Sequence, residues 1–111
     1  MEKQILELMS HIANDYAQWK SRGEYGSPDD YATRLKQLNV EEGRKYYRIT
    51  TNETNGQTMV WGFIMKEDDK KFKKGDILKA ASWSTPARNK PRGNILQDDF
   101  SWVRWTGPEY L

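Results

Sequence analysis

The sequence contains no cysteine, a single histidine and no long run of apolar residues. Without cysteine there can be no disulfide framework and no thiolate metal site, so a reducing compartment is the natural setting. No stretch reaches membrane-spanning length, and the N-terminal segment MEKQILELM carries charges where a secretion signal needs its apolar run. We therefore expect a cytoplasmic protein that does not associate with membranes.

Recognisable catalytic arrangements are missing as well. The chain has no glycine-rich loop for phosphate, and Asp98 and Asp99 would point to opposite faces of a strand, where they cannot act as a pair. His11 borders an apolar helical stripe and has no second histidine to share a metal ion, which favours a residue at the edge of the core. We expect a binding protein rather than an enzyme, with no cofactor and no metal site.

The composition predicts one domain, residues 1–111, with an aromatic-rich core. Only 36% of the residues are hydrophobic and 31% are charged, which is lean for a globular protein. Five tryptophans, six tyrosines and three phenylalanines compensate, because each of these side chains buries a large area.

The first 40 residues predict a pair of antiparallel helices. A helix from residue 1 to about 21 is predicted by an apolar stripe with helical spacing, formed by Ile5, Met9, Ile12, Tyr16 and Trp19. Ser27, Pro28 and the two aspartates that follow predict the start of a second helix, which runs to about Leu38.

A strand hairpin is predicted around Asn55 and Gly56, because both residues tolerate the positive φ of a tight turn. In this register Thr54 faces Gln57, and Arg48 lies across from Phe63. One face collects Tyr47, Ile49, Thr51, Val60 and Ile64, and the other collects Tyr46, Arg48, Thr50, Met59, Trp61, Phe63 and Met65. The helices can cover only one of these apolar faces, so we expect another subunit or a ligand on the other, and at least a homodimer.

The rest of the chain predicts further strands. Residues 66–76 alternate blocks of opposite charge and predict a mobile surface loop whose lysines and acids screen one another. Alternation predicts strands at 77–84 and 100–106, with a short one at 94–97. The expected fold class is α+β, with two N-terminal antiparallel helices packed on a C-terminal antiparallel sheet of about five strands that spans 43–107.

The loop after the 77–84 strand is the main candidate for function. No acidic residue occurs from Ile77 to Gln97, a stretch that carries Lys79, Arg88, Lys90 and Arg92. Pro86 and Pro91 restrict the backbone of this loop, so it should be a stiff clamp for an anion. A single basic loop is more often a solvated surface, but Trp83 just before it favours a binding role.

The triplet Arg92-Gly93-Asn94 closes this loop and is the leading candidate for ligand contact. Gly93 allows either a close backbone approach or a positive φ, and Asn94 adds an amide that donates and accepts hydrogen bonds. We expect the triplet to line a pocket and to contribute little to folding.

Arginines, an asparagine and tryptophans together suit a ligand with phosphates, sugar hydroxyls and a flat base. Single-stranded nucleic acid fits the same inventory, but the total charge is only +2 and the first 42 residues carry a net −3, so we expect nucleic acid less than a small nucleotide. A third interpretation is a protein that docks on a protein target through Trp61, Phe63 and Met65.

Two N-terminal helices, a strand, a hairpin, the segment KKGDILKAASW and a proline-flanked basic run ending in RGNI form a pattern that resembles the Thoeris anti-defence family of bacteriophage sponge proteins. Proteins of that family sequester cyclic ADP-ribose signals made by bacterial immune enzymes. The resemblance covers nearly all of the chain. It implies non-enzymatic sequestration of a cyclic ADP-ribose isomer, glycocyclic ADP-ribose, in the cytoplasm of an infected bacterial host cell.

The resemblance also implies a homo-oligomer, a dimer or a hexamer, with a nucleotide pocket near the subunit interface. Its ligand contacts are an aromatic side chain at the base, and an asparagine and arginines at the sugar and phosphates. Together with the basic loop, these contacts give a candidate ligand-binding set of Trp83, Arg88, Arg92, Asn94, Arg48 and Arg104.

Overall fold

The computed structural model describes residues 2–20, 28–53, 56–88, 90–97, 100–104 and 107–108. Two helices precede the strands: α1 (Glu2–Lys20) and α2 (Pro28–Gln37). The five-stranded antiparallel sheet has the order β1 (Leu38–Glu42), β2 (Tyr46–Asn52), β3 (Thr58–Met65), β4 (Asp76–Leu78) and β5 (Gly93–Asn94), and a separate ribbon pairs β6 (Val103–Arg104) with β7 (Gly107–Pro108). The predicted α+β fold, two N-terminal helices on an antiparallel sheet, is confirmed.

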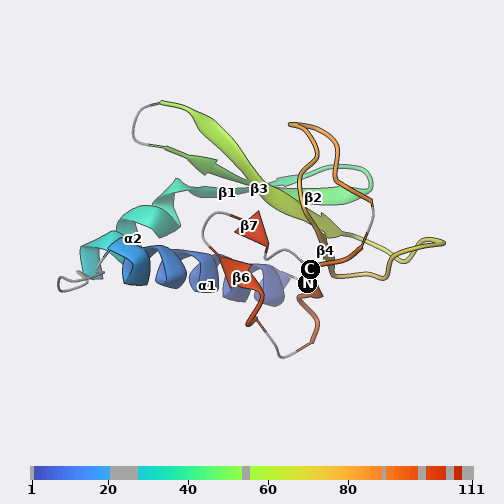
Figure 1. The fold of residues 1–111 in the computed structure, drawn as a ribbon, viewed down its shortest axis with the longest axis horizontal. Coiled ribbons are helices and arrows are strands. Elements are labelled where there is room, and N and C mark those ends of the chain that lie inside the picture. The colour runs from blue at the N-terminus through green and yellow to red at the C-terminus, as the bar shows by residue number, and fades with distance from the viewer. Residues whose placement is uncertain are drawn as a thin grey trace.

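Both helices were predicted from their apolar spacing, and α1 lies along one face of the sheet with α2 beside it (Figure 1). The core between helices and sheet includes Ile5, Leu8, Ile12, Ile49, Ile64 and Ile77. The buried stripe is shorter than expected, because Trp19 is exposed. Tyr16 lies under the guanidinium of Arg34, whose Cζ is 4.4 Å from the ring centroid, so this part of α1 packs against α2.

The first strand lies earlier in the chain than predicted, since Leu38 was expected at the end of the second helix and the sheet was expected to begin at residue 43. α2 ends at Gln37, and β1 pairs with β2 so that Leu38 lies opposite Thr51 and Glu42 opposite Tyr47. The segment LNVEE has only two apolar residues, which gave too little alternation to identify a strand. The helical part of the chain is therefore 2–37, and the sheet begins at 38.

The central hairpin of β2 and β3 has the expected register at the end away from its turn, where Arg48 lies opposite Phe63. Between Ile49 and Thr50 the register shifts by one residue, so that Thr50 pairs with Val60 and Asn52 with Thr58. Thr54 and Asn55 lie outside the described residues, and Gln57 accepts a hydrogen bond from the backbone N–H of Glu53 (2.7 Å). Gly56 has the expected positive φ, 88°. The irregularity is a β-bulge, which redirects the side chains beyond it.

This bulge corrects the expected distribution of side chains. Trp61 is 3% exposed and belongs to the core on the helix side, where its Nε1 donates to the backbone oxygen of Arg104 (2.7 Å). Phe63 and Met65 do face the other side, but they are buried in a second cluster with Phe72 and Leu78. The apolar face that was expected to need another subunit is thus covered by residues of the same chain, and only Met59 of that set stays largely exposed (53%).

The segment from Lys66 to Asp76 differs from the mobile, self-screened loop that its charges predicted. Phe72 is buried in the second core cluster. Two carboxylates of the loop accept hydrogen bonds from backbone N–H groups. Asp68 accepts the N–H of Lys74 (2.7 Å), and Asp76 accepts the N–H of Lys73 (2.8 Å). An aromatic anchor and internal hydrogen bonds therefore fix the path of this loop.

Later strands are shorter than the alternation suggested. β4 ends at Leu78. Of the other residues predicted for this strand, 79–84, Ala80 forms an isolated bridge with Pro86, and Trp83 lies on a loop rather than at a strand end. β5 is Gly93–Asn94 in place of 94–97, and the 100–106 strand is reduced to Val103–Arg104, with Trp105 and Thr106 outside the described residues. Among the described residues, no helix combines the length and apolarity needed to cross a membrane.

Candidate functional site

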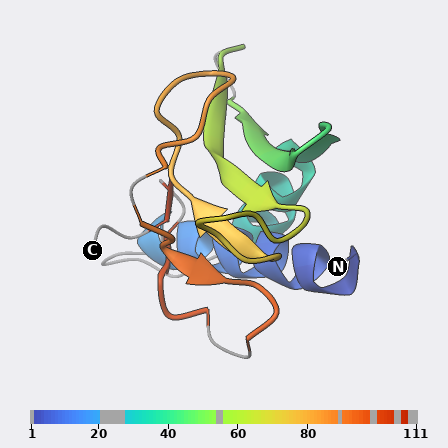
Figure 2. The same cartoon turned by 90° about the vertical axis from the view of Figure 1, so that its right-hand side faces the viewer.

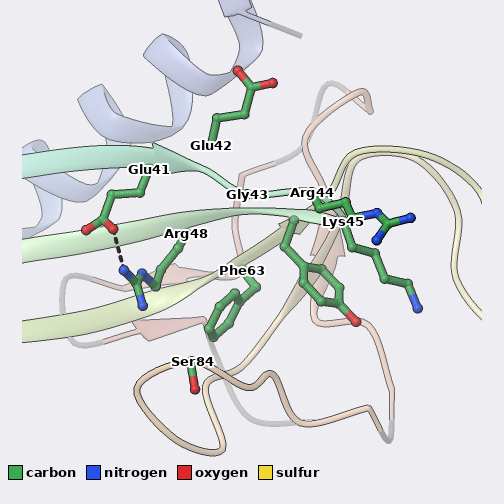
Figure 3. Close-up of a pocket in the computed structure, with 9 residues that line it drawn as sticks. Glu41, Glu42, Gly43, Arg44, Lys45, Arg48, Phe63 and Ser84 are labelled. Atoms are coloured by element: carbon green, nitrogen blue, oxygen red, sulfur yellow. Dashed lines mark hydrogen bonds and ion pairs between the residues drawn. The ribbon is translucent and has the colours of Figure 1, made fainter.

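A cleft of about 420 Å³ opens between the turn that joins β1 to β2 and the loop that carries Trp83. The turn is closed by the backbone N–H of Gly43, which donates to the oxygen of Tyr46 (2.8 Å). The cleft is lined by Glu41, Glu42, Gly43, Arg44, Lys45, Tyr46, Arg48, Phe63 and Ser84. In Figure 3, Arg48 and Glu41 face each other at one side of the cleft, Arg44 and Lys45 extend from the turn at the other, and Glu42 points away.

Arg48 forms one wall of the cleft and is held in place by three groups. Its guanidinium stacks on the indole of Trp83, with Cζ 4.7 Å from the ring centroid. Its Nη1 donates to the backbone oxygen of Trp83 (3.0 Å), and its Nη2 forms an ion pair with Glu41. A stacked and hydrogen-bonded guanidinium is pre-organised for a planar or anionic ligand, and the indole beside it is half exposed (50%).

The opposite side of the Trp83 loop is fixed by Arg88. Its Nη1 donates to the hydroxyl of Tyr46, its Nη2 forms an ion pair with Asp69 (2.5 Å), and its Cζ lies 4.8 Å from the ring centroid of Phe72. Tyr46 in turn meets Phe63 edge to face, with centroids 5.8 Å apart. Arg88 thus ties the basic loop to the aromatic floor of the cleft, and its hydrogen bond to Asp69 raises the pKa of its guanidinium.

Asp69 is the carboxylate on which this arrangement depends. It accepts the backbone N–H of Phe72 (2.7 Å), Nη2 of Arg88 (2.5 Å) and the backbone N–H of Lys71 (2.8 Å). These hydrogen bonds, in that order of importance, hold the pKa of Asp69 well below its usual range. The negative charge of Asp69 is therefore retained in the folded protein under acidic conditions that protonate an ordinary aspartate.

The low pKa of Asp69 predicts a pH-dependent contribution to stability. Because the folded-state pKa lies below the unfolded value of about 3.9, Asp69 stabilises the fold above that pH, and the contribution is lost as the pH falls below it. Asp69→Asn should lower the melting temperature by a constant amount between about pH 5 and 7, and the gap to the wild type should narrow progressively as the pH falls below about 4. Glu67→Gln, the same change at an exposed neighbour, is the control. A gap for Asp69→Asn that persisted at the lowest pH would show that the charge is not its cause.

The six candidate ligand-binding residues fall into two groups. Arg48 lines the cleft, Trp83 stacks on Arg48, and Arg88 binds Tyr46 of the cleft floor, so these three are brought together. Arg92, Asn94 and Arg104 do not line this cleft. Arg104 lies on β6, where its Nη1 donates to the backbone oxygens of Ser101 (2.9 Å) and Val103 (2.8 Å).

The Arg92-Gly93-Asn94 triplet is part of the fold, contrary to the expectation that it contributes little to folding. Arg92 is buried, and its backbone N–H donates to the oxygen of Ile77 (2.8 Å). The Asn94 amide donates to Asp76 (2.9 Å) and to the backbone oxygen of Lys74 (3.0 Å), and it accepts the N–H of Leu96 (2.8 Å). Asn94 thus joins β5 to the end of the loop from Lys66 to Asp76.

Several residues of the cleft were not singled out from the sequence. Arg44 and Lys45 follow Gly43 in a short turn, and Tyr46 was assigned only to a strand face. Their signal was present, since two adjacent cations beside a glycine mark an exposed turn. Nothing in the sequence indicated that this turn meets a loop some forty residues further along the chain. Among the described residues, no group of three or more histidine, aspartate or glutamate side chains gathers where it could hold a metal ion.

The fold and the cleft define a small α+β protein with a cleft that is lined by three cationic side chains, two carboxylates and two aromatic rings. The chain belongs to a family of unknown function (DUF7717), whose model matches residues 1–110. No curated protein and no solved structure matched the chain.

Proposed function

We propose that this protein is a non-catalytic binding protein that sequesters a nucleotide-like ligand in the cleft between the β1–β2 turn and the Trp83 loop. The ligand that the resemblance to the Thoeris anti-defence sponges implies is a cyclic ADP-ribose isomer, glycocyclic ADP-ribose. Sequestration would remove this signal from bacterial anti-phage immunity. The same resemblance implies a cytoplasmic homo-oligomer, and this part of the proposal no longer rests on an exposed hairpin face, because that face is buried.

The observation that carries the proposal is the stacking of Arg48 on the half-exposed Trp83 at the edge of the cleft. A flat base can stack beside such a pair, while Arg44 and Lys45 at the far side of the cleft suit phosphates. The cleft volume, about 420 Å³, lies within the range of small-ligand sites.

The groups of the cleft can supply the binding free energy that sequestration needs. A sponge needs submicromolar affinity, which corresponds to about 8 kcal/mol or more. Two charge-assisted contacts to phosphate supply roughly 1.5 to 3 kcal/mol each, and stacking of one base supplies roughly 1 to 3 kcal/mol. Because Glu41 and Trp83 already hold Arg48, little side-chain entropy remains to be lost on binding.

The experiment is a calorimetric titration with glycocyclic ADP-ribose on two matched variants. Arg48→Ala should weaken binding roughly 30- to 150-fold, because it removes a charged donor worth about 2 to 3 kcal/mol. Arg104→Ala makes the same chemical change at an exposed arginine outside the cleft and should leave the affinity unchanged. Melting temperatures of both variants separate lost binding from lost folding.

Three outcomes would overturn the proposal. Absence of binding by the wild-type protein removes the ligand assignment. Loss of affinity in Arg104→Ala with no loss in Arg48→Ala moves the site away from the cleft. Recovery of a cleaved nucleotide after the protein is heat-denatured shows an enzyme rather than a sponge.

A further inference from the structure

Three basic segments that are far apart in the sequence lie at one end of the molecule. They are the β1–β2 turn with the start of β2 (44–48), the loop 66–76 and the end of the Trp83 loop (88 and 90–92). Together they carry eleven lysines and arginines and four carboxylates, a net of +7, which leaves −5 for the rest of the chain. Arg92 is buried, and Glu41 and Glu42, just before the first segment, pair with Arg48 and Lys66. The small total charge of the protein therefore hides a strongly polarised molecule.

Direct contacts join the three segments. The backbone N–H of Lys66 donates to the oxygen of Lys45 (3.2 Å), which places the loop beside the β1–β2 turn. Lys71 Nζ donates to the backbone oxygen of Arg88, and Arg88 pairs with Asp69 across the same loop. Figure 2 looks onto this end of the molecule, with the loop toward the viewer.

The loop 66–76 presents its charges unequally. The carboxylates of Asp69 and Asp76 are turned to backbone N–H groups and to Arg88 or Asn94, and neither residue is exposed. Lys70, Lys71, Lys73 and Lys74 are exposed, and of the carboxylates Glu67 and Asp68 are exposed. Long lysine stems carry their ammonium groups outward, whereas two of the four carboxylates are turned to the loop itself, so the outer surface is more positive than the sequence of the loop suggests.

We propose that this end of the molecule, centred on Lys70, Lys73 and Lys74, binds the phosphate backbone of single-stranded nucleic acid. Neutralisation of several phosphates by clustered lysines releases counterions and supplies affinity without base readout. The exposed indole of Trp83, stacked on Arg48 of the same basic end, provides a surface for a base of such a strand.

An anionic membrane fits this surface less well. A membrane-binding loop inserts an apolar side chain, but the one aromatic side chain of this loop, Phe72, is buried in the core. A strand of nucleic acid needs only the outward ammonium groups and an aromatic surface, both of which are present. The low total charge, which weighed against nucleic acid in the sequence, does not describe the field at this end.

The test measures fluorescence polarisation of a labelled oligothymidylate of about 20 nucleotides at about 50 and 200 mM salt. The variant is Lys70→Gln/Lys73→Gln, and the matched control is Lys3→Gln/Lys36→Gln, which removes the same charge from exposed positions on the two helices. Each lost phosphate contact lowers the salt slope by about 0.7, so the loop variant should bind roughly 60-fold more weakly at about 50 mM salt. The control should stay close to the wild type.

Equal weakening of both variants would overturn the proposal, because it would show a response to net charge rather than to this surface. So would the absence of oligonucleotide binding by the wild type, tighter binding to a duplex of the same length, or tighter binding to vesicles containing anionic phospholipid. None of these readouts uses a cyclic nucleotide, so the result is independent of the ligand proposed for the cleft.

Discussion

Gly93→Ala is expected to destabilise the protein by about 3 kcal/mol, because the indole of Trp102 occupies the space of the new methyl group. A Cβ built on Gly93 would lie 2.3 Å from Cε2 and 2.4 Å from Nε1 of Trp102. Gly93 has no positive φ, so the constraint is steric rather than conformational. From the sequence, Gly93 was expected to allow either a close backbone approach or a positive φ, and the structure shows a close approach to a side chain of the same protein.

The indole cannot move aside without disturbing its neighbours. Trp102 is 9% exposed and belongs to the same core cluster as Ile95 and Val103, and its ring lies 5.9 Å from that of Phe100. Phe100 in turn stacks on His11 of α1, with centroids 4.5 Å apart. Displacement of Trp102 would therefore loosen the contact between β5 and the C-terminal segment that covers α1.

A double-mutant cycle checks this reason for the loss. Thermal unfolding should show a drop of roughly 10 to 20 °C for Gly93→Ala. Trp102→Ala removes all three of the clashing atoms, so the double variant should be clearly more stable than the sum of the two single changes predicts. Additive losses would mean that the two residues are not in contact in solution. Gly56→Ala is a useful comparison, because no atom lies within 4 Å of its Cβ and any loss there comes from its φ of 88°.

Much of the fold followed from local patterns. The helices were predicted because Ile5, Met9 and Ile12 repeat at helical spacing and because Pro28 begins α2. The hairpin and the pairing of Arg48 with Phe63 followed from the alternation on each side of Gly56. These features depend on residues close together in the chain, where period and turn chemistry are visible.

The errors came from features that depend on distant residues. The bulge between Ile49 and Thr50 turns Trp61 into the helix-side core, and strict alternation cannot indicate such an extra residue. Phe72 lies in a segment that was predicted to be a mobile surface loop, yet it fills the second core and removes the need for a covering subunit.

The candidate site was predicted only in part, because it too depends on contacts between distant residues. Trp83, Arg48 and Arg88 were chosen for their chemistry, and the structure gathers them. Asn94 has equally suitable chemistry, but its amide donates to Asp76 and to the backbone oxygen of Lys74, and Arg92 is buried. Residue type alone does not separate an amide that awaits a ligand from one that braces a strand, because the difference lies in tertiary partners.

Glu53→Ala is expected to cost about 3 kcal/mol of stability, because it leaves the guanidinium of Arg34 buried without its carboxylate. Arg34 is 2% exposed, and its Nη1 and Nη2 donate to the two oxygens of Glu53 at 2.9 and 3.1 Å. The pair joins α2 to the end of β2, and the guanidinium also lies over the ring of Tyr16. Neither residue was singled out in the sequence, where nineteen positions separate them.

The expected losses at the two ends of this ion pair are unequal. Arg34→Met keeps much of the side-chain volume and removes the buried charge, and the remaining Glu53 is partly exposed, so it can be hydrated. Arg34→Met should therefore cost less than Glu53→Ala, and the double variant should be more stable than Glu53→Ala alone. Glu42→Ala, which removes a carboxylate paired with Lys66 at the surface, should cost at most about 1 kcal/mol. Denaturant unfolding of the four variants measures these differences. A loss for Glu53→Ala as small as that for Glu42→Ala would mean that water reaches the Arg34 guanidinium and that the pair does not hold α2 on the sheet.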